Sequence, residues 1–315
     1  MKIKKWKGGF RPFLTEDESM ISTTSSRNTV YVYNAGNGKL LHTVKTVSNV
    51  SETAVSGDGK LLAAKNTSGT ISVICLETQE EICRSAMEGR EGYAMLFMPD
   101  HRTLLDFDWE GRTMRLDCIT GRHDILDGPG AGVKSLPKLT SHIQYDAFSN
   151  QICKLCYNGS GLPGGRVMVS PACADQIAFR TVHEFETALP RASDGLSFCR
   201  TNNYYLDRRQ NQLVAADKNF TELFRKELPA PGICSVDKIW VSKNEKYLFM
   251  DFGRQCDSRD FAAYKTAKSL SCLFALDTMD QIAEFDYDYV SDFMTFDGDR
   301  KFLLATWHGS YMGVL

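Results

Sequence analysis

Several short motifs in this sequence contain residue types that could do chemistry. Gly159, Gly161 and Gly164 have the spacing of a dinucleotide-binding loop, but that motif needs a strand before it and a helix after it. Pro163 interrupts the motif, and residues 166–170 (Arg-Val-Met-Val-Ser) continue as a strand-like run. We therefore interpret this segment as a hairpin loop rather than a phosphate-binding loop.

Cys153 and Cys156 form a C-x-x-C motif, which could bind zinc or carry redox chemistry. A structural zinc site needs a second cysteine pair or histidines at suitable spacing, and Cys173 and His183 do not supply it. The run Gln-Ile-Cys-Lys-Leu-Cys-Tyr at residues 151–157 has the composition of a strand. No two of the six histidines have a zinc-binding spacing. The sequence therefore predicts no metal site and no cofactor.

Two pairs of aspartates could do acid–base work. Asp106 and Asp108, like Asp286 and Asp288, have strand spacing and share one side of a strand. Paired carboxylates catalyse only at a suitable separation, and we expect these pairs to line solvated loops instead. The Gly-x-Ser-x-Gly motif of serine hydrolases is absent. No catalytic residues are predicted.

Composition and charge restrict the functional classes to which this protein can belong. The chain has 315 residues, of which 43% are hydrophobic, so it can bury a large core. Its net charge of −2 gives no basic footprint for nucleic acid, and no apolar run approaches the roughly 18 residues of a membrane helix. The basic N-terminus is not followed by the apolar stretch that a secretory signal needs, which argues against such a signal. The ten cysteines are scattered through strand-like runs, which suits a reduced, cytoplasmic protein.

The elements that would position any site come from a repeat. An apolar residue, a polar turn and a second apolar run recur along the chain, with clear copies beginning at Val55, Phe97, Val241 and Phe296. Successive turns lie 41 residues (Asp17 to Asp58) to 55 residues (Asn244 to Asp299) apart. The seven turn residues that mark the repeats are Asp17, Asp58, Asp100, Asn150, Thr201, Asn244 and Asp299. A strand–turn–strand repeat of this period is typical of a β-propeller.

The end of the chain lacks one strand. The segment after Asp299 supplies strands at residues 301–306 and 311–315 but has no residues for a further one. Residues 2–7 precede the first repeat and can pair there, which removes two exposed sheet edges; the alternative is that residues 1–9 form a loose tail. We predict an all-β fold, a seven-bladed β-propeller whose last blade is closed by the N-terminal strand, as a single domain over residues 1–315.

This pattern resembles the WD-repeat and related propeller superfamily over essentially the whole chain. The Gly-His and Trp-Asp dipeptides of that superfamily are absent, and Ser68 and Glu110 stand near the position of its turn aspartate. The superfamily's Asp–His hydrogen-bond network therefore cannot be carried over. The chain looks like a divergent, WD-repeat-like propeller.

The resemblance implies that loops between blades, and loops between the second and third strands, share one top face where partners dock. Trp109 and Trp307 occupy equivalent loops, and interfaces favour Trp, Tyr and Arg. The alternative is that these residues shield blade edges. The residues expected on or near the top face are Arg90, Tyr93, Trp109, Arg112, Arg208, Arg209, Arg254, Trp307 and His308.

The leading functional hypothesis is a non-enzymatic protein- or peptide-binding scaffold that uses this top face. An alternative is an enzyme or small-ligand binder of the lactonase, lyase or hydrolase type, with a site in the central channel. Carbohydrate binding through exposed aromatic residues is a third possibility. We expect neither nucleic acid nor membrane as a partner, and the sequence does not specify an oligomeric state.

Overall fold

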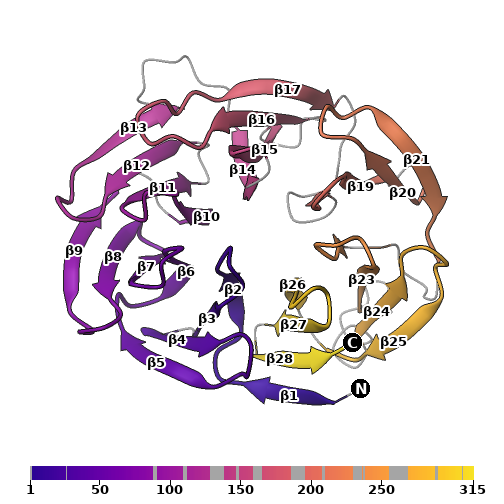
Figure 1. The fold of residues 1–315 in the computed structure, drawn as a ribbon, viewed down its shortest axis with the longest axis horizontal. Coiled ribbons are helices and arrows are strands. Elements are labelled where there is room, and N and C mark those ends of the chain that lie inside the picture. The colour runs from indigo at the N-terminus through magenta and orange to yellow at the C-terminus, as the bar shows by residue number, and fades with distance from the viewer. Residues whose placement is uncertain are drawn as a thin grey trace. The chain divides into compact units, whose positions relative to one another are not determined.

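The computed structural model describes residues 2–25, 27–87, 91–108, 112–127, 138–146, 149–158, 165–185, 196–207, 210–229, 236, 238–254, 269–287, 290–306 and 308–315. None of these residues is helical, and their strands form seven four-stranded antiparallel sheets (Figure 1). The chain divides into two compact units, one made of residues 7–188 and the other of residues 1–6 and 189–315.

The unit of residues 7–188 contains four sheets, each with its strands in chain order, which we number as blades 1 to 4. Blade 1 is β2 (Phe10–Leu14), β3 (Met20–Thr24), β4 (Thr29–Asn34) and β5 (Leu40–Lys45). Blade 2 is β6 (Val50–Val55), β7 (Leu61–Asn66), β8 (Thr70–Cys75) and β9 (Glu81–Ala86). Blade 3 is β10 (Gly92–Phe97), β11 (Thr103–Asp108), β12 (Thr113–Asp117) and β13 (His123–Asp127). Blade 4 is β14 (Lys138–Asp146), β15 (Gln151–Asn158), β16 (Gly165–Pro171) and β17 (Arg180–Phe185).

The other unit contains blades 5 to 7. Blade 5 is β18 (Leu196–Phe198), β19 (Asn203–Asp207), β20 (Gln212–Ala216) and β21 (Glu222–Glu227). Blade 6 is β22 (Lys238–Val241), β23 (Tyr247–Arg254), β24 (Ser269–Ala275) and β25 (Gln281–Phe285). Blade 7 is β26 (Val290–Phe296), β27 (Lys301–Thr306) and β28 (Gly309–Val314), with β1 (Ile3–Trp6) as its fourth strand.

The pairing of β1 with β28 confirms that the N-terminal strand closes the last blade. The register runs from Ile3 opposite Gly313 to Trp6 opposite Ser310. Trp6 is the one buried side chain of this strand. Strand β27 has the predicted bounds, whereas β28 begins two residues earlier than predicted because Gly309 already pairs with Thr306. The fold is the predicted seven-bladed β-propeller, and the single domain over residues 1–315 stays a prediction.

The predicted marker residues all lie between the first and second strands of their blades. Three of the aspartates make the same turn, in which the carboxylate accepts the amide two residues further on. These hydrogen bonds are Ser19 N to Asp17 (3.0 Å), Lys60 N to Asp58 (3.2 Å) and Arg102 N to Asp100 (3.0 Å). The repeated sequence pattern therefore reflects a repeated local structure.

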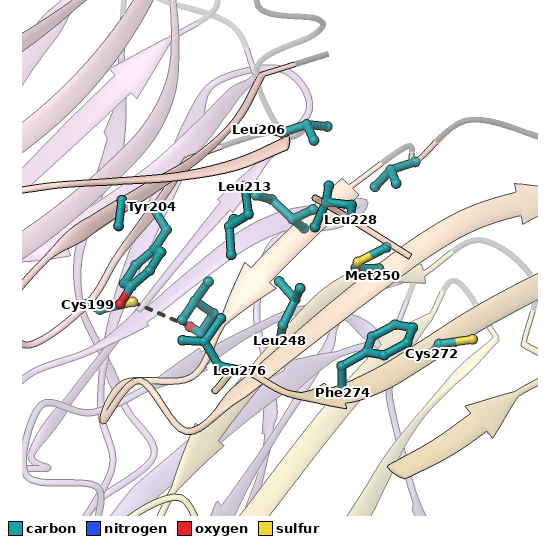
Figure 2. Packing of buried hydrophobic residues seen from close by; sticks show 14 of the residues in the cluster. Cys199, Tyr204, Leu206, Leu213, Leu228, Leu248, Met250, Cys272, Phe274 and Leu276 are labelled. Carbon is teal, nitrogen blue, oxygen red and sulfur yellow. Dashed lines mark hydrogen bonds between the residues drawn. The ribbon is translucent and has the colours of Figure 1, made fainter. Parts of the chain in front are cut away.

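Period-two alternation builds the core between neighbouring blades. On β23, Leu248 and Met250 point into a cluster shared with blade 5, which includes Leu213 and Tyr204 (Figure 2). Phe249 points the other way and stacks on Phe293 of blade 7, with ring centroids 4.3 Å apart. The second strand of this blade is thus apolar on both faces, unlike a strand with one face in water.

Two motifs from the sequence prove to be parts of hairpins. Cys153 and Cys156 both lie within β15, as predicted, and the described cysteines form no disulfide. Strand β16 follows the glycine motif where a dinucleotide fold needs a helix, and residues 159–164 lie outside the described residues. In the part of the chain that is described, no helix is long and apolar enough to cross a bilayer.

Candidate binding site at the loop-bearing end of blades 1 to 3

The loop that carries Trp109 is held at its base by a buried carboxylate. Asp108 ends β11 and is fully buried, and its Oδ1 accepts the backbone amide of Arg112 at 2.8 Å. The Arg112 guanidinium lies 3.4 Å from the other carboxylate oxygen, Oδ2. One side chain therefore fixes both the backbone and the side chain of Arg112, directly before β12 begins.

The equivalent loop of blade 7, which carries Trp307, has a related base. Thr306 ends β27 and is buried, and its hydroxyl donates to the carbonyl of Gly309 at 2.9 Å. The same oxygen accepts the amide of His308 at 3.1 Å. In both hairpins a buried polar side chain at the end of the second strand ties the two strand ends together.

A charged cluster surrounds the base of the Trp109 loop. Arg11 of β2 forms an ion pair with Glu52 of β6, and its Nη1 donates to the carbonyl of Gly92 on β10 at 2.9 Å. Gly92 pairs directly with Asp108 across the blade 3 ladder. The first strands of three successive blades are thus joined by one guanidinium, next to the Asp108–Arg112 contact.

A second, deeper ion pair belongs to the same region. Lys65 Nζ lies 2.7 Å from both carboxylate oxygens of Asp106, which is two residues before Asp108 on β11. Both side chains are fully buried. Burial raises the pKa of the Asp106 carboxyl, and the Lys65 ammonium opposes that rise. We call the six residues Arg11, Glu52, Lys65, Asp106, Asp108 and Arg112 the charge cluster.

Close backbone packing positions this cluster. A Cβ atom added to Gly92 would lie 1.8 Å from the carbonyl oxygen of Phe107, so only glycine fits there. Strands β2, β6 and β10 each have a register irregularity at this end, and such bulges change the direction of a side chain. Arg11 lies in the β2 bulge with a φ of 42°, a left-handed conformation that costs an arginine energy.

Of the predicted top-face residues, the structure describes Arg112 and His308 fully. Arg112 lies in the charge cluster, and His308 is exposed in the blade 7 hairpin. Tyr93 and Arg254 lie in β10 and β23, but their side chains are outside what is described. The remaining predicted residues, also outside the described part, are Arg90, Trp109, Arg208, Arg209 and Trp307.

The prediction for the Asp106 and Asp108 pair was wrong about its surroundings. These aspartates do not line a solvated loop; they lie in the second strand of blade 3, where neighbouring blades exclude water. The sequence analysis also missed Arg11, Glu52 and Lys65. The sequence feature that could have identified Lys65 is a charged residue inside an otherwise apolar second strand, as in Leu-Leu-Ala-Ala-Lys at residues 61–65. Asp286 is exposed, and Asp288 lies outside the described residues.

The described residues contain no group of three or more His, Cys, Asp or Glu side chains that could hold a metal ion. In the charge cluster, every carboxylate has a cationic partner. The ion pairs restrain the side chains of Arg11 and Arg112 at this end of the blades.

Comparison with known proteins supports the fold. No protein-family model matches the sequence, and no curated protein matches it. The β-propeller domain of Myceliophteria thermophila Cps50 (Swd1) is 9% identical and covers 100% of both chains, with a TM-score of 0.68. This likeness shows a β-propeller fold. Kuenenia stuttgartiensis hydrazine synthase is 12% identical over 99% of this chain and 97% of that chain, with a TM-score of 0.64. At these identities the two likenesses show the β-propeller fold alone.

Proposed function

We propose that this propeller is a non-enzymatic scaffold that binds a protein or peptide through the loops at the second-to-third-strand end of its blades. The observation that carries the proposal is the fixed base of the Trp109 loop, where Asp108 holds Arg112 through its backbone and its guanidinium. A binding loop with a rigid base loses little conformational entropy when a partner docks. Tryptophan and arginine are the residues that most often dominate interface energies.

The equivalent construction under Trp307 supports the same proposal. Thr306 and Asp108 are different residue types at equivalent positions, yet each ties its hairpin with a buried oxygen. Resemblance to WD-repeat-like propellers adds the expectation that partners dock on this end. A cytoplasmic location, and the absence of nucleic acid and membrane partners, belong to the same proposal.

The test is affinity capture from the native source with the wild-type protein and a W109A/W307A variant. We expect the variant to lose the partner while its melting temperature stays within a few degrees of wild type. Arg102→Gln is the matched surface control, because Arg102 lies at the opposite end of β11 in an exposed ion pair with Asp117. A large loss of melting temperature in the tryptophan variant would assign the two indoles a structural role instead.

The alternative of an enzyme or small-ligand binder in the central channel stays a prediction from the sequence. Stoichiometric calcium, zinc or manganese in the purified protein would favour it over the scaffold.

A further inference from the structure

The fourth strand of each blade lies at one edge of its sheet. It pairs with the third strand, and no further strand of the sheet lies on its other side. Such an edge can pair with a strand of another chain, above all where it carries exposed apolar side chains. On four of these strands an aliphatic residue is 38%, 40%, 52% or 48% exposed, and these residues are, in that order, Leu41, Ile82, Leu223 and Ile282.

Each of these four aliphatic residues is the extra residue of a β-bulge. In blade 2, Ile74 pairs with Glu81 and Val73 pairs with Cys83, so the ladder passes over Ile82. The residues passed over in the same way in blades 1, 5 and 6 are Leu41, Leu223 and Ile282. A bulge bends its strand and interrupts the regular spacing of the backbone groups, which hinders pairing with a straight strand.

Ion pairs close across two of these bulges. In a regular strand, residues three apart point to opposite faces, but one extra residue brings them to the same face. In blade 2, Arg84 Nη2 lies 2.7 Å from Glu81 Oε2, and Arg84 Nε lies 3.0 Å from the other carboxylate oxygen. In blade 5, Arg225 Nε and Nη2 each lie 2.6 Å from an oxygen of Glu222. These ion pairs therefore favour the bulged form of the strand over the regular form.

The remaining fourth strands are interrupted or short. Strands β13 and β17 have register irregularities of their own, at other positions. Strand β1 has a regular register, but it is four residues long and exposes Lys4 and Lys5 next to Ile3. Short strands and lysines also hinder pairing at a sheet edge. Each of the seven sheet edges that these strands form thus carries a feature of this kind.

We propose that the bulges in β5, β9, β21 and β25 prevent these edges from adding a strand of a second copy of this chain. A second copy presents the same edges with the same exposed aliphatic residues, so two unprotected edges could form a symmetric contact. If the bulges served only to adapt the twist of each blade, removing one would change the stability of the protein but not its association. The association state therefore decides between the two roles.

The experiment deletes Ile82 from the full chain. Glu81 and Cys83 already face consecutive residues of β8, so the deletion leaves a regular ladder and keeps both side chains on their present faces. We expect light scattering to give about twice the wild-type mass, or more, at concentrations where the wild type is monodisperse. Ile82→Ala is the matched control, because it removes most of the same side chain but keeps the extra residue. It should remain as monodisperse as the wild type.

Hydrogen exchange shows whether the association is strand pairing. The amides of β9 should exchange more slowly in the associated deletion variant than in the wild type, because a new strand covers the edge. Faster exchange throughout blade 2 would mean that partial unfolding causes the association, which contradicts the proposal. If blade 2 does not fold without Ile82, deletion of Leu223 makes the same test in blade 5, where the ladder passes over that residue.

Two further results would overturn the proposal. One is a deletion variant that has a wild-type circular dichroism spectrum and stays as monodisperse as the wild type. The other is association of Ile82→Ala to the same extent as the deletion variant, which would assign the effect to the side chain and not to the bulge. The binding role proposed for the loops between second and third strands does not depend on either result.

Discussion

Lys65 Nζ lies 2.7 Å from both carboxylate oxygens of Asp106, and neither side chain is exposed to solvent. The pair joins the second strand of blade 2 to the second strand of blade 3. Taking two charges out of water is costly, so the pair stabilises the fold only when both members are present.

Replacing one member of this ion pair should destabilise the fold more than replacing both members. We expect Lys65→Met to lower the free energy of unfolding by about 3–5 kcal/mol, because the Asp106 carboxylate is then buried without its ammonium partner. The double variant K65M/D106L should recover most of that loss. Urea denaturation of the wild type and the variants measures both values. If the double variant were as unstable as Lys65→Met, the cost would come from packing and not from the unpaired charge.

Gly92 provides a prediction about close backbone approach. Gly92→Ala should lower the free energy of unfolding by about 2 kcal/mol or more, because the new Cβ would lie 1.8 Å from the Phe107 carbonyl oxygen and the backbone must move. Gly298→Ala is the matched control, since Gly298 has a φ of +66° but no atom within 4 Å of its added Cβ. That control should lose only about 1 kcal/mol, for the left-handed backbone alone. Equal losses in the two variants would contradict the steric argument.

The strands could be predicted from the sequence because the same short turns recur between them in successive blades. At Thr78, Thr120 and Thr278, the threonine hydroxyl accepts the amide two residues later in three equivalent turns. The residue after each threonine has a φ between 61° and 72°, so the three turns share a backbone conformation as well as a threonine. Local geometry of this kind can be inferred from residue type and spacing.

The candidate site could be predicted only in part, because its contacts cross between blades. Arg112 was found through its place in a loop next to a tryptophan. Arg11 and Glu52 are 41 positions apart in the sequence and meet only because the first strands of blades 1 and 2 are neighbours. No local pattern marks such a pair, whereas the blade repeat would have placed both residues at the same end of their blades.

Glu245 links blades 5 and 6, and its hydrogen bonds should make the stability of the folded protein depend on pH. Its carboxylate accepts the amides of Thr201 and Asn202, the Thr201 hydroxyl, the Asn202 side-chain amide and the Tyr204 hydroxyl. Burial alone would raise the pKa of Glu245, but these hydrogen bonds outweigh it and hold the pKa below its usual value of 4.5. The charged form is therefore the form that the folded protein favours.

A group with a lowered folded pKa stabilises the protein above its unfolded pKa and loses that contribution as the pH falls through the folded value. Glu245→Gln should therefore show a shallower loss of stability below about pH 4.5 than wild type, when the free energy of unfolding is measured by urea denaturation across the acid range. Glu284→Gln, at an exposed glutamate of blade 6, should keep the wild-type acid slope. An unchanged slope in Glu245→Gln would mean that the hydrogen bonds do not favour the carboxylate.

Trp6 should determine whether the N-terminal strand stays in blade 7. It is 4% exposed, whereas Ile3, Lys4 and Lys5 of the same strand are exposed, so one indole supplies most of the apolar contact that holds β1 against β28. Trp6→Ala should lower the free energy of unfolding by about 3–5 kcal/mol. It should also speed amide hydrogen exchange in β28, because the β28 edge becomes exposed when β1 detaches.

Lys4→Ala is the control for this prediction, since it changes the same strand at an exposed position opposite Met312. It should leave hydrogen exchange in β28 unchanged. A detached β1 leaves an open sheet edge that can pair with another chain, so Trp6→Ala should also aggregate at concentrations where Lys4→Ala remains monodisperse. If Trp6→Ala keeps the wild-type rates of amide exchange in β28, the prediction is wrong. Backbone hydrogen bonds of the four-residue strand β1 would then be enough to keep it paired with β28 without the indole.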